Sequence, residues 1–202
     1  MVQIKEEIVN QGHGYLSPSL FAVHSTANPG ATARNHRDLW SRGYDYAVHL
    51  TSDWKEAIHC VPYDRLCWQV GNGNTTCEGI EICEATNASD FWKGIDIAAD
   101  VIAQRLRAHG WGVDRMHPHS WFSQTYGGSD HTDPDSVFQP LRLHVAGIHS
   151  TRPTEAIRQT PGNTRRLDIM AAMMIRNDST GSHLVLRARQ GTHRAHTPRS
   201  GQ

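Results

Sequence analysis

The chain has 202 residues, enough for one domain with a hydrophobic core and a short additional segment. Its formal charge is zero, yet residues 1–140 hold 10 Lys and Arg against 17 Asp and Glu, whereas residues 141–202 hold 10 Arg against 3 acidic residues. The first ten residues lack the apolar core of a signal peptide and no later run is long enough to span a bilayer, so we expect no transmembrane segment and synthesis in the cytoplasm.

The first elements follow from short apolar runs. Residues 19–25 form an apolar run that predicts a buried strand ending near His24. After the breaker Asn28-Pro29-Gly30, residues 31–40 predict a helix. Residues 46–51 and 56–61 have strand length and are separated by a polar pair, which favours a hairpin.

The next segments contain the clearest loop and the clearest helix. Residues 71–74, with the sequence Gly-Asn-Gly-Asn, predict a loop, and residues 79–83 predict another buried strand. Residues 90–109 carry apolar side chains at helical spacing, with Ser89 or Asp90 available as the N-cap and Gly110 just past the end.

This order of elements predicts an α/β fold with a mixed central β-sheet flanked by helices. We divide the chain into a catalytic domain (residues 1–140), a linker (residues 141–168) and a short C-terminal segment (residues 169–202). The last segment is either a fragment of a second module or disordered, which makes the C-terminal tail poorly defined. The four cysteines lie within one short interval without paired metal spacing, which favours free, mostly buried thiols; they are Cys60, Cys67, Cys77 and Cys83.

Three separated positions have the chemistry of a catalytic zinc site. His24 stands at the end of the first long predicted strand, His117 and His119 flank Pro118, and Asp133 precedes Pro134. Two imidazoles and one carboxylate bind zinc and leave a fourth position for water. With 14 histidines in the chain, no single one is specific, and either His117 or His119 can supply the second imidazole, with His119 favoured.

Several motifs in the same order resemble one enzyme family. These are Phe21-Ala22-Val23-His24-Ser25-Thr26, the segment from Asn74 to Glu81, and His131-Thr132-Asp133-Pro134. Together with residues 56–62 and 66–71, they are similar to zinc-dependent N-acetylmuramoyl-L-alanine amidases of phage endolysins and to peptidoglycan recognition proteins. The resemblance covers about residues 20–135 and implies a mixed sheet below a peptidoglycan groove.

The resemblance also implies roles for individual residues. His24, His119 and Asp133 would bind Zn²⁺, and Glu81 would move protons between the water and the leaving amine. His131 stands where many relatives have Lys and would stabilise the oxyanion.

Further positions match the wall of the family's groove. We expect substrate contacts from Trp68, Gln69 and Asn74, and either substrate contact or packing from His49. Gln69 replaces a His that many relatives have after the Trp, and the loop from His119 to Asp133 is longer than in compact relatives. The aromatic residues in that loop either line the groove or belong to a surface loop.

The predicted function is that of an endolysin that cleaves the amide between N-acetylmuramic acid and L-alanine in bacterial peptidoglycan. Such a protein would be synthesised in the host cytoplasm, reach the wall after release by a holin, and act as a monomer. The alternatives are a zinc peptidase that cuts the stem or cross-bridge and a non-catalytic peptidoglycan-binding module. We do not expect nucleic-acid binding by the Arg-rich tail, because aromatic residues are missing after Phe138.

Overall fold

The computed structural model describes residues 1–134. Six strands form one sheet in the order β1-β4-β3-β5-β2-β6, in which only β3 and β4 are antiparallel neighbours. This mixed α/β sheet confirms the fold class expected from the sequence. The predicted linker at residues 141–168 and the segment at residues 169–202 lie outside the described residues.

The strands are β1 (Ile4–Glu6), β2 (Leu20–Ser25), β3 (Leu50–Ser52), β4 (Ala57–His59), β5 (Cys77–Ile82) and β6 (Met116–Pro118). The helices are α1 (Ala33–Trp40), α2 (Ala88–His109) and α3 (His119–Tyr126), with short 3-10 turns η1 (Gly71–Thr76) and η2 (Val113–Arg115). None of the helices in this part of the chain has both the length and the apolar composition needed to cross a membrane.

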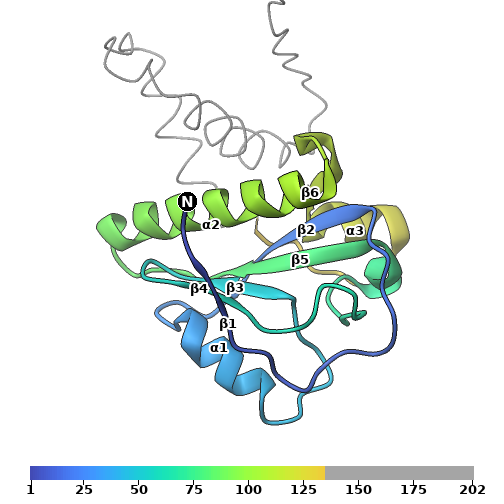
Figure 1. The fold of residues 1–202 in the computed structure, drawn as a ribbon, viewed down its shortest axis with the longest axis horizontal. Helices are drawn as coiled ribbons and strands as arrows, with labels where there is room; N and C mark the ends of the chain where they lie inside the picture. The colour runs from blue at the N-terminus through green and yellow to red at the C-terminus, as the bar shows by residue number, and fades with distance from the viewer. Residues whose placement is uncertain (135–202) are drawn as a thin grey trace, which may run out of the picture.

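Alternating side chains give the sheet two different faces. Phe21 and Val23 of β2 and Ile80 of β5 pack with the apolar side of α2. Ala22 and Cys77 point to the opposite face, where they pack with Phe122 of α3. Figure 1 shows α2 and α1 on opposite sides of the sheet. Residues at even positions of β2 and odd positions of β5 therefore share the face that does not contact α2.

The two predicted helices form for the expected reasons. Thr32 caps α1 through a capping box with Asn35. Gly110 ends α2 in the left-handed conformation, as predicted, but the N-cap is Asn87 rather than Ser89 or Asp90. All four cysteines are free and buried, which confirms the expectation from their spacing.

Other elements differ from the prediction. The hairpin exists, but β3 and β4 are shorter than residues 46–51 and 56–61. The strands β1 and β6 were not predicted, and α3 lies where a loop was expected. Phe122 of α3 is completely buried, so it belongs to the core and cannot line a groove.

Candidate metal centre

The topology brings three of the candidate residues to the carboxyl ends of parallel strands. His24 and Glu81 are register partners near the ends of β2 and β5, which run parallel. The strand β6 is parallel to β2 on its other side, and His119 follows it directly as the first residue of α3. Ligands commonly bind at this edge of an α/β sheet.

Asp133 reaches the same place from the segment that follows α3. Its carbonyl oxygen accepts a hydrogen bond from the backbone N–H of Ser120, at 3.2 Å. Its carboxylate accepts one from the backbone N–H of Ser25, at 3.3 Å. These two contacts dock the segment against both β2 and the first turn of α3.

Ring nitrogens and carboxylate oxygens converge at this edge. The Nδ1 atoms of His24 and His119 are 3.1 Å apart. Asp133 Oδ2 lies 3.4 Å from Nδ1 of His24, and Oδ1 lies 3.1 Å from Nδ1 of His119. Among the described residues, these three are the group of His, Cys and acidic side chains placed to hold an ion together.

This arrangement fits a tetrahedral zinc ion. With metal–ligand bonds of about 2.0–2.1 Å, tetrahedral geometry places ligand atoms about 3.3–3.4 Å apart, close to the three distances above. Burial lowers the pKa of His24, which favours the neutral ring that binds a metal. The donor set of two neutral imidazoles and a carboxylate is also that of catalytic zinc sites.

The remaining ring nitrogen of His119 has a partner of its own. Nε2 lies 3.0 Å from the hydroxyl oxygen of Ser129, which can accept its proton. That bond leaves the Nδ1 lone pair free to face the centre of the site. The same hydroxyl accepts a hydrogen bond from the backbone N–H of His131, so Ser129 links His119 to the loop beside it.

Charge stabilises the anionic form of Asp133. Burial alone raises the pKa of the carboxyl group, but hydrogen bonds and charge interactions with His119 and His24 outweigh it. The pKa of Asp133 is therefore well below its ordinary value, and the carboxylate is present at neutral pH.

Glu81 lies beside His24 in a different environment. Its Oε2 atom is buried and has no hydrogen-bond partner among residues 1–134. Burial raises the pKa of Glu81 well above its ordinary value, and the negative charges of Asp133 and Glu84 raise it further. The pKa of Glu81 is thus shifted in the opposite direction to that of Asp133, and such opposed carboxyl groups are typical of acid–base sites.

The fold gives different surroundings to three histidines that are near one another in the sequence: His117, His119 and His131. His131 is two-thirds exposed, and its Nδ1 lies 3.8 Å from Asp133 Oδ1, so it stands at the open side of the centre. His117 lies in β6 and stacks on Trp121, at 3.7 Å between ring centroids. Of the two alternatives for the second imidazole, the fold places His119 and not His117 beside His24.

His49 is not available for substrate contact. It is fully buried, its Nδ1 accepts a hydrogen bond from the backbone N–H of Gly79, and its Nε2 donates one to the carbonyl of Arg65. Burial lowers the pKa of His49 to about 4, so the ring is neutral. Of the two expected roles, the structure supports packing, because the ring joins two backbone segments.

The other three residues expected to contact substrate differ in their exposure and hydrogen bonding. Trp68 is 48% exposed and stacks on His13 at 3.7 Å. The Asn74 side-chain oxygen accepts hydrogen bonds from the backbone N–H groups of Gln69 and Val70, so Asn74 holds a turn. Gln69 donates through Nε2 to the carbonyl of Cys77, and its Oε1 is buried. Of these three, Trp68 is the exposed residue, and Gln69 and Asn74 are partly buried.

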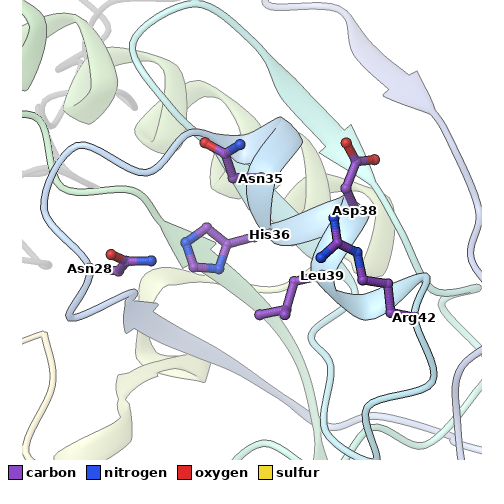
Figure 2. Close-up of a pocket in the computed structure, with 6 residues that line it drawn as sticks. All are labelled: Asn28, Asn35, His36, Asp38, Leu39 and Arg42. Carbon is purple, nitrogen blue, oxygen red and sulfur yellow. The ribbon is translucent and has the colours of Figure 1, made fainter.

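A polar cavity beside α1 was not predicted. It has a volume of about 290 Å³ and lies between α1 and the loop after β2. Figure 2 shows the ring of His36 pointing from α1 toward Asn28. Burial lowers the pKa of His36, and its Nε2 has no hydrogen-bond partner within the described chain. A single His in a helix carries no sequence signal for such a cavity.

The mixed sheet, with three potential metal ligands at one edge, defines an α/β protein of the kind that has a site at the carboxyl ends of its strands. A family model described as N-acetylmuramoyl-L-alanine amidase matches residues 14–136, more than half of the chain. The protein therefore belongs to this amidase family, and the family resemblance found in the sequence is confirmed.

Curated relatives match over part of their length. The amidase XlyB of Bacillus subtilis is 27% identical over 117 residues, which cover 55% of this chain and 37% of XlyB. The amidase CwlA of the same organism is 28% identical over 110 residues, covering 52% of this chain and 40% of CwlA. The matched region thus spans about two fifths of each relative.

Solved structures share the fold. The catalytic domain of XlyA has a TM-score of 0.60 and 26% identity, covering 73% of this chain and 99% of that domain. The hydrolase AmiA of Staphylococcus aureus, solved with its ligand, has a TM-score of 0.66 and 23% identity, covering 85% of this chain and 83% of AmiA. The second likeness supports the fold alone.

Proposed function

We propose that this protein is a zinc-dependent amidase that hydrolyses the bond between the lactyl group of N-acetylmuramic acid and L-alanine in peptidoglycan. The observation that carries the proposal is the convergence of His24, His119 and Asp133 at the spacing of a tetrahedral ion, with Glu81 at their side. Membership of the amidase family supports the choice of bond.

The three side chains would hold Zn²⁺ through two Nδ1 atoms and the carboxylate of Asp133. A zinc ion supplies a Lewis acid and lowers the pKa of a bound water from about 15.7 to about 7. The donors are held in place by β2, by β6 and by the docked segment around Asp133.

Glu81 is the proposed acid–base residue. Its carboxylate accepts a proton from the attacking water and then donates that proton to the amide nitrogen of the leaving L-alanine. The buried position, without a competing hydrogen bond at Oε2, leaves that oxygen free for this exchange. The raised pKa of Glu81 makes it a better proton carrier near neutral pH than an exposed glutamate.

His131 is the proposed group for the developing oxyanion. Its ring stands on the open side of the centre, 4.9 Å between centroids from the ring of His119. A ring N–H in this position can donate to the substrate oxygen as negative charge forms on it.

Trp68 is the proposed contact for the glycan. The indole comes directly before Gln69 in the chain and presents half of its surface, while His13 supports the other face of the ring. A flat, rigid aromatic surface of this kind suits a sugar ring.

Two properties stay predictions from the sequence: release to the wall by a holin, and action as a monomer. Two rival functions are a zinc peptidase that cuts within the stem or cross-bridge, which would use the same kind of His/His/Asp site, and a binding module without turnover.

Digestion of purified peptidoglycan, with and without chelator, distinguishes the three functions. Mass spectrometry of the products should show peptides with a free N-terminal L-alanine and intact glycan strands, and chelator should abolish them. Release of D-alanine or of cross-bridge fragments would favour the peptidase. Sedimentation of the protein with peptidoglycan, without any soluble product, would favour the binding module.

A further inference from the structure

The side chain of Gln69 lies against the sheet beside the metal centre. Its Nε2 donates a hydrogen bond to the carbonyl of Cys77, at 3.0 Å, which fixes the plane of the amide. The backbone around it is also fixed, because the N–H groups of Gln69 and Val70 both donate to the side chain of Asn74. The amide oxygen is therefore held in one direction.

Gly79 provides the space for this amide. A Cβ atom at position 79 would lie 2.1 Å from Oε1 of Gln69 and 3.2 Å from the carbonyl oxygen of Ala22. Gly79 is the register partner of Ala22, and the next pair on the same face is His24 with Glu81. The amide oxygen thus rests on the sheet one pair away from His24.

Two buried polar atoms near this point have no other partner. Nε2 of His24 and Oε1 of Gln69 are both inaccessible to solvent, and neither has a hydrogen-bond partner among the described residues. A buried ring N–H and a buried amide oxygen are each unfavourable when they are alone. Burial lowers the pKa of His24, and the neighbouring amide of Gln69 acts in the opposite direction.

We propose that Gln69 is a positioning residue that accepts the Nε2–H of His24 and so holds the Nδ1 lone pair of that ring toward the metal. This inference rests on the proposed zinc function and assigns Gln69 a role other than substrate binding. His24 then matches His119, whose Nε2 faces Ser129. Each of the two imidazoles then donates its Nε2–H to one acceptor that does not touch the metal.

Such an outer acceptor changes metal affinity without touching the metal. It selects one tautomer, fixes the ring orientation and raises the basicity of the ligating nitrogen, and its loss typically costs about 10–100-fold in affinity. We therefore expect Gln69→Met, which keeps the shape but removes the amide, to weaken zinc binding by about 10-fold or more.

Three variants of the full chain test this role. Gln69→Met removes both the acceptor and the donor. Gln69→Glu keeps an oxygen for His24 but loses the donor to Cys77, so it should lower the stability of the zinc-free protein yet retain zinc affinity near that of the parent. Gln11→Met is the matched control, because Gln11 is also buried and donates to a carbonyl, that of Trp40, at 2.8 Å.

Two quantities are measured for each variant: the zinc Kd by competition with a chromogenic chelator, and the Tm of the zinc-free protein. Our proposal requires that zinc affinity falls in Gln69→Met alone, while Tm falls in all three. Equal zinc affinity for Gln69→Met and the parent would overturn it, as would affinity that follows Tm across the three variants. Parent protein that binds no zinc would instead refute the proposed function.

A measurement on the parent does not depend on the folding of any variant. Nitrogen-15 NMR of the imidazole groups in the zinc-loaded protein reports the Nε2 proton of His24, because the metal takes Nδ1. We expect this proton to exchange slowly with water and to show the downfield shift of a hydrogen bond. A rapidly exchanging Nε2 proton, as in an imidazole without an acceptor, would overturn the proposal.

Discussion

A buried ion cluster fixes the strand that carries Glu81. Glu78 is the second residue of β5, has no exposed side-chain surface, and accepts hydrogen bonds from Arg105 of α2 at 2.6 and 3.0 Å. His109, one turn further along α2, lies 2.8 Å from the same carboxylate. Tyr63 stacks beneath the guanidinium of Arg105, at 3.4 Å to the ring centroid. The cluster ties β5 to the long helix.

We predict that Glu78→Gln strongly destabilises the protein. Removing one partner of a buried ion pair typically costs about 3–5 kcal/mol, and because Gln keeps one acceptor oxygen we expect about 3 kcal/mol. For a domain of this size that corresponds to a loss in Tm of about 10 °C, measured by circular dichroism at pH 7. Glu7→Gln is the control, since its pair with Arg34 is partly exposed and screened by solvent.

The destabilisation should depend on pH. Burial raises the pKa of Glu78, but the hydrogen bonds from His109 and Arg105 outweigh this and leave the pKa below its ordinary value. A lowered pKa in the folded state stabilises the protein above the ordinary carboxyl pKa, and that contribution declines as the pH falls toward the folded value. The gap in Tm between parent and Glu78→Gln should therefore narrow below about pH 4.5. Equal stability at pH 7, or a gap that does not change with pH, would refute this reasoning.

Three further predictions concern the metal centre. Glu81→Gln should bind zinc like the parent but lose about 100- to 10,000-fold in turnover, measured by release of N-terminal alanine; turnover near the parent rate would contradict its acid–base role. Asp133→Ala should weaken zinc binding, measured by chelator competition, by more than about 100-fold. The loss should exceed the roughly 10–100-fold typical of an outer hydrogen bond, because Asp133 is itself a proposed ligand. Gly79→Ala should lower stability by about 1–3 kcal/mol in urea unfolding and weaken zinc binding, because its Cβ overlaps the amide of Gln69; an unchanged zinc Kd would show that Gln69 does not need this space.

Local patterns in the sequence were sufficient for the central elements. The apolar run at residues 19–25 predicted β2, and helical periodicity with Gly110 at its end predicted α2. The end of β2 also placed His24 correctly at the sheet edge. Such features depend on neighbouring residues, which the sequence shows directly.

Features that depend on distant contacts were missed. The segment His119–Tyr126 contains Ser, Thr and aromatic residues, which are weak helix formers, and forms α3 because Phe122 packs against Val70 and Cys77. His49 was expected at the groove or in packing, and only the fold shows that its partners are backbone groups of Gly79 and Arg65.

The choice between His117 and His119 also needed the fold. Both residues flank Pro118, and an extended backbone would point them to the same side. The change from strand to helix at His119 turns the two rings apart, so that one stacks on Trp121 and the other faces His24. A helix start that the sequence did not reveal therefore decides which ring reaches the site.

The docking of Asp133 against β2 joins positions more than one hundred residues apart in the chain. An ion shared by His24 and Asp133 would act as a cross-link that closes this long loop, and closing long loops gives the largest entropic stabilisation of the folded state. Chelation would then remove both the Lewis acid that activates water and the cross-link that stabilises the fold. Loss of lysis after chelator treatment should accordingly be compared with the unfolding temperature of the same sample, and limited proteolysis should cut the segment between Gly127 and Pro134 first.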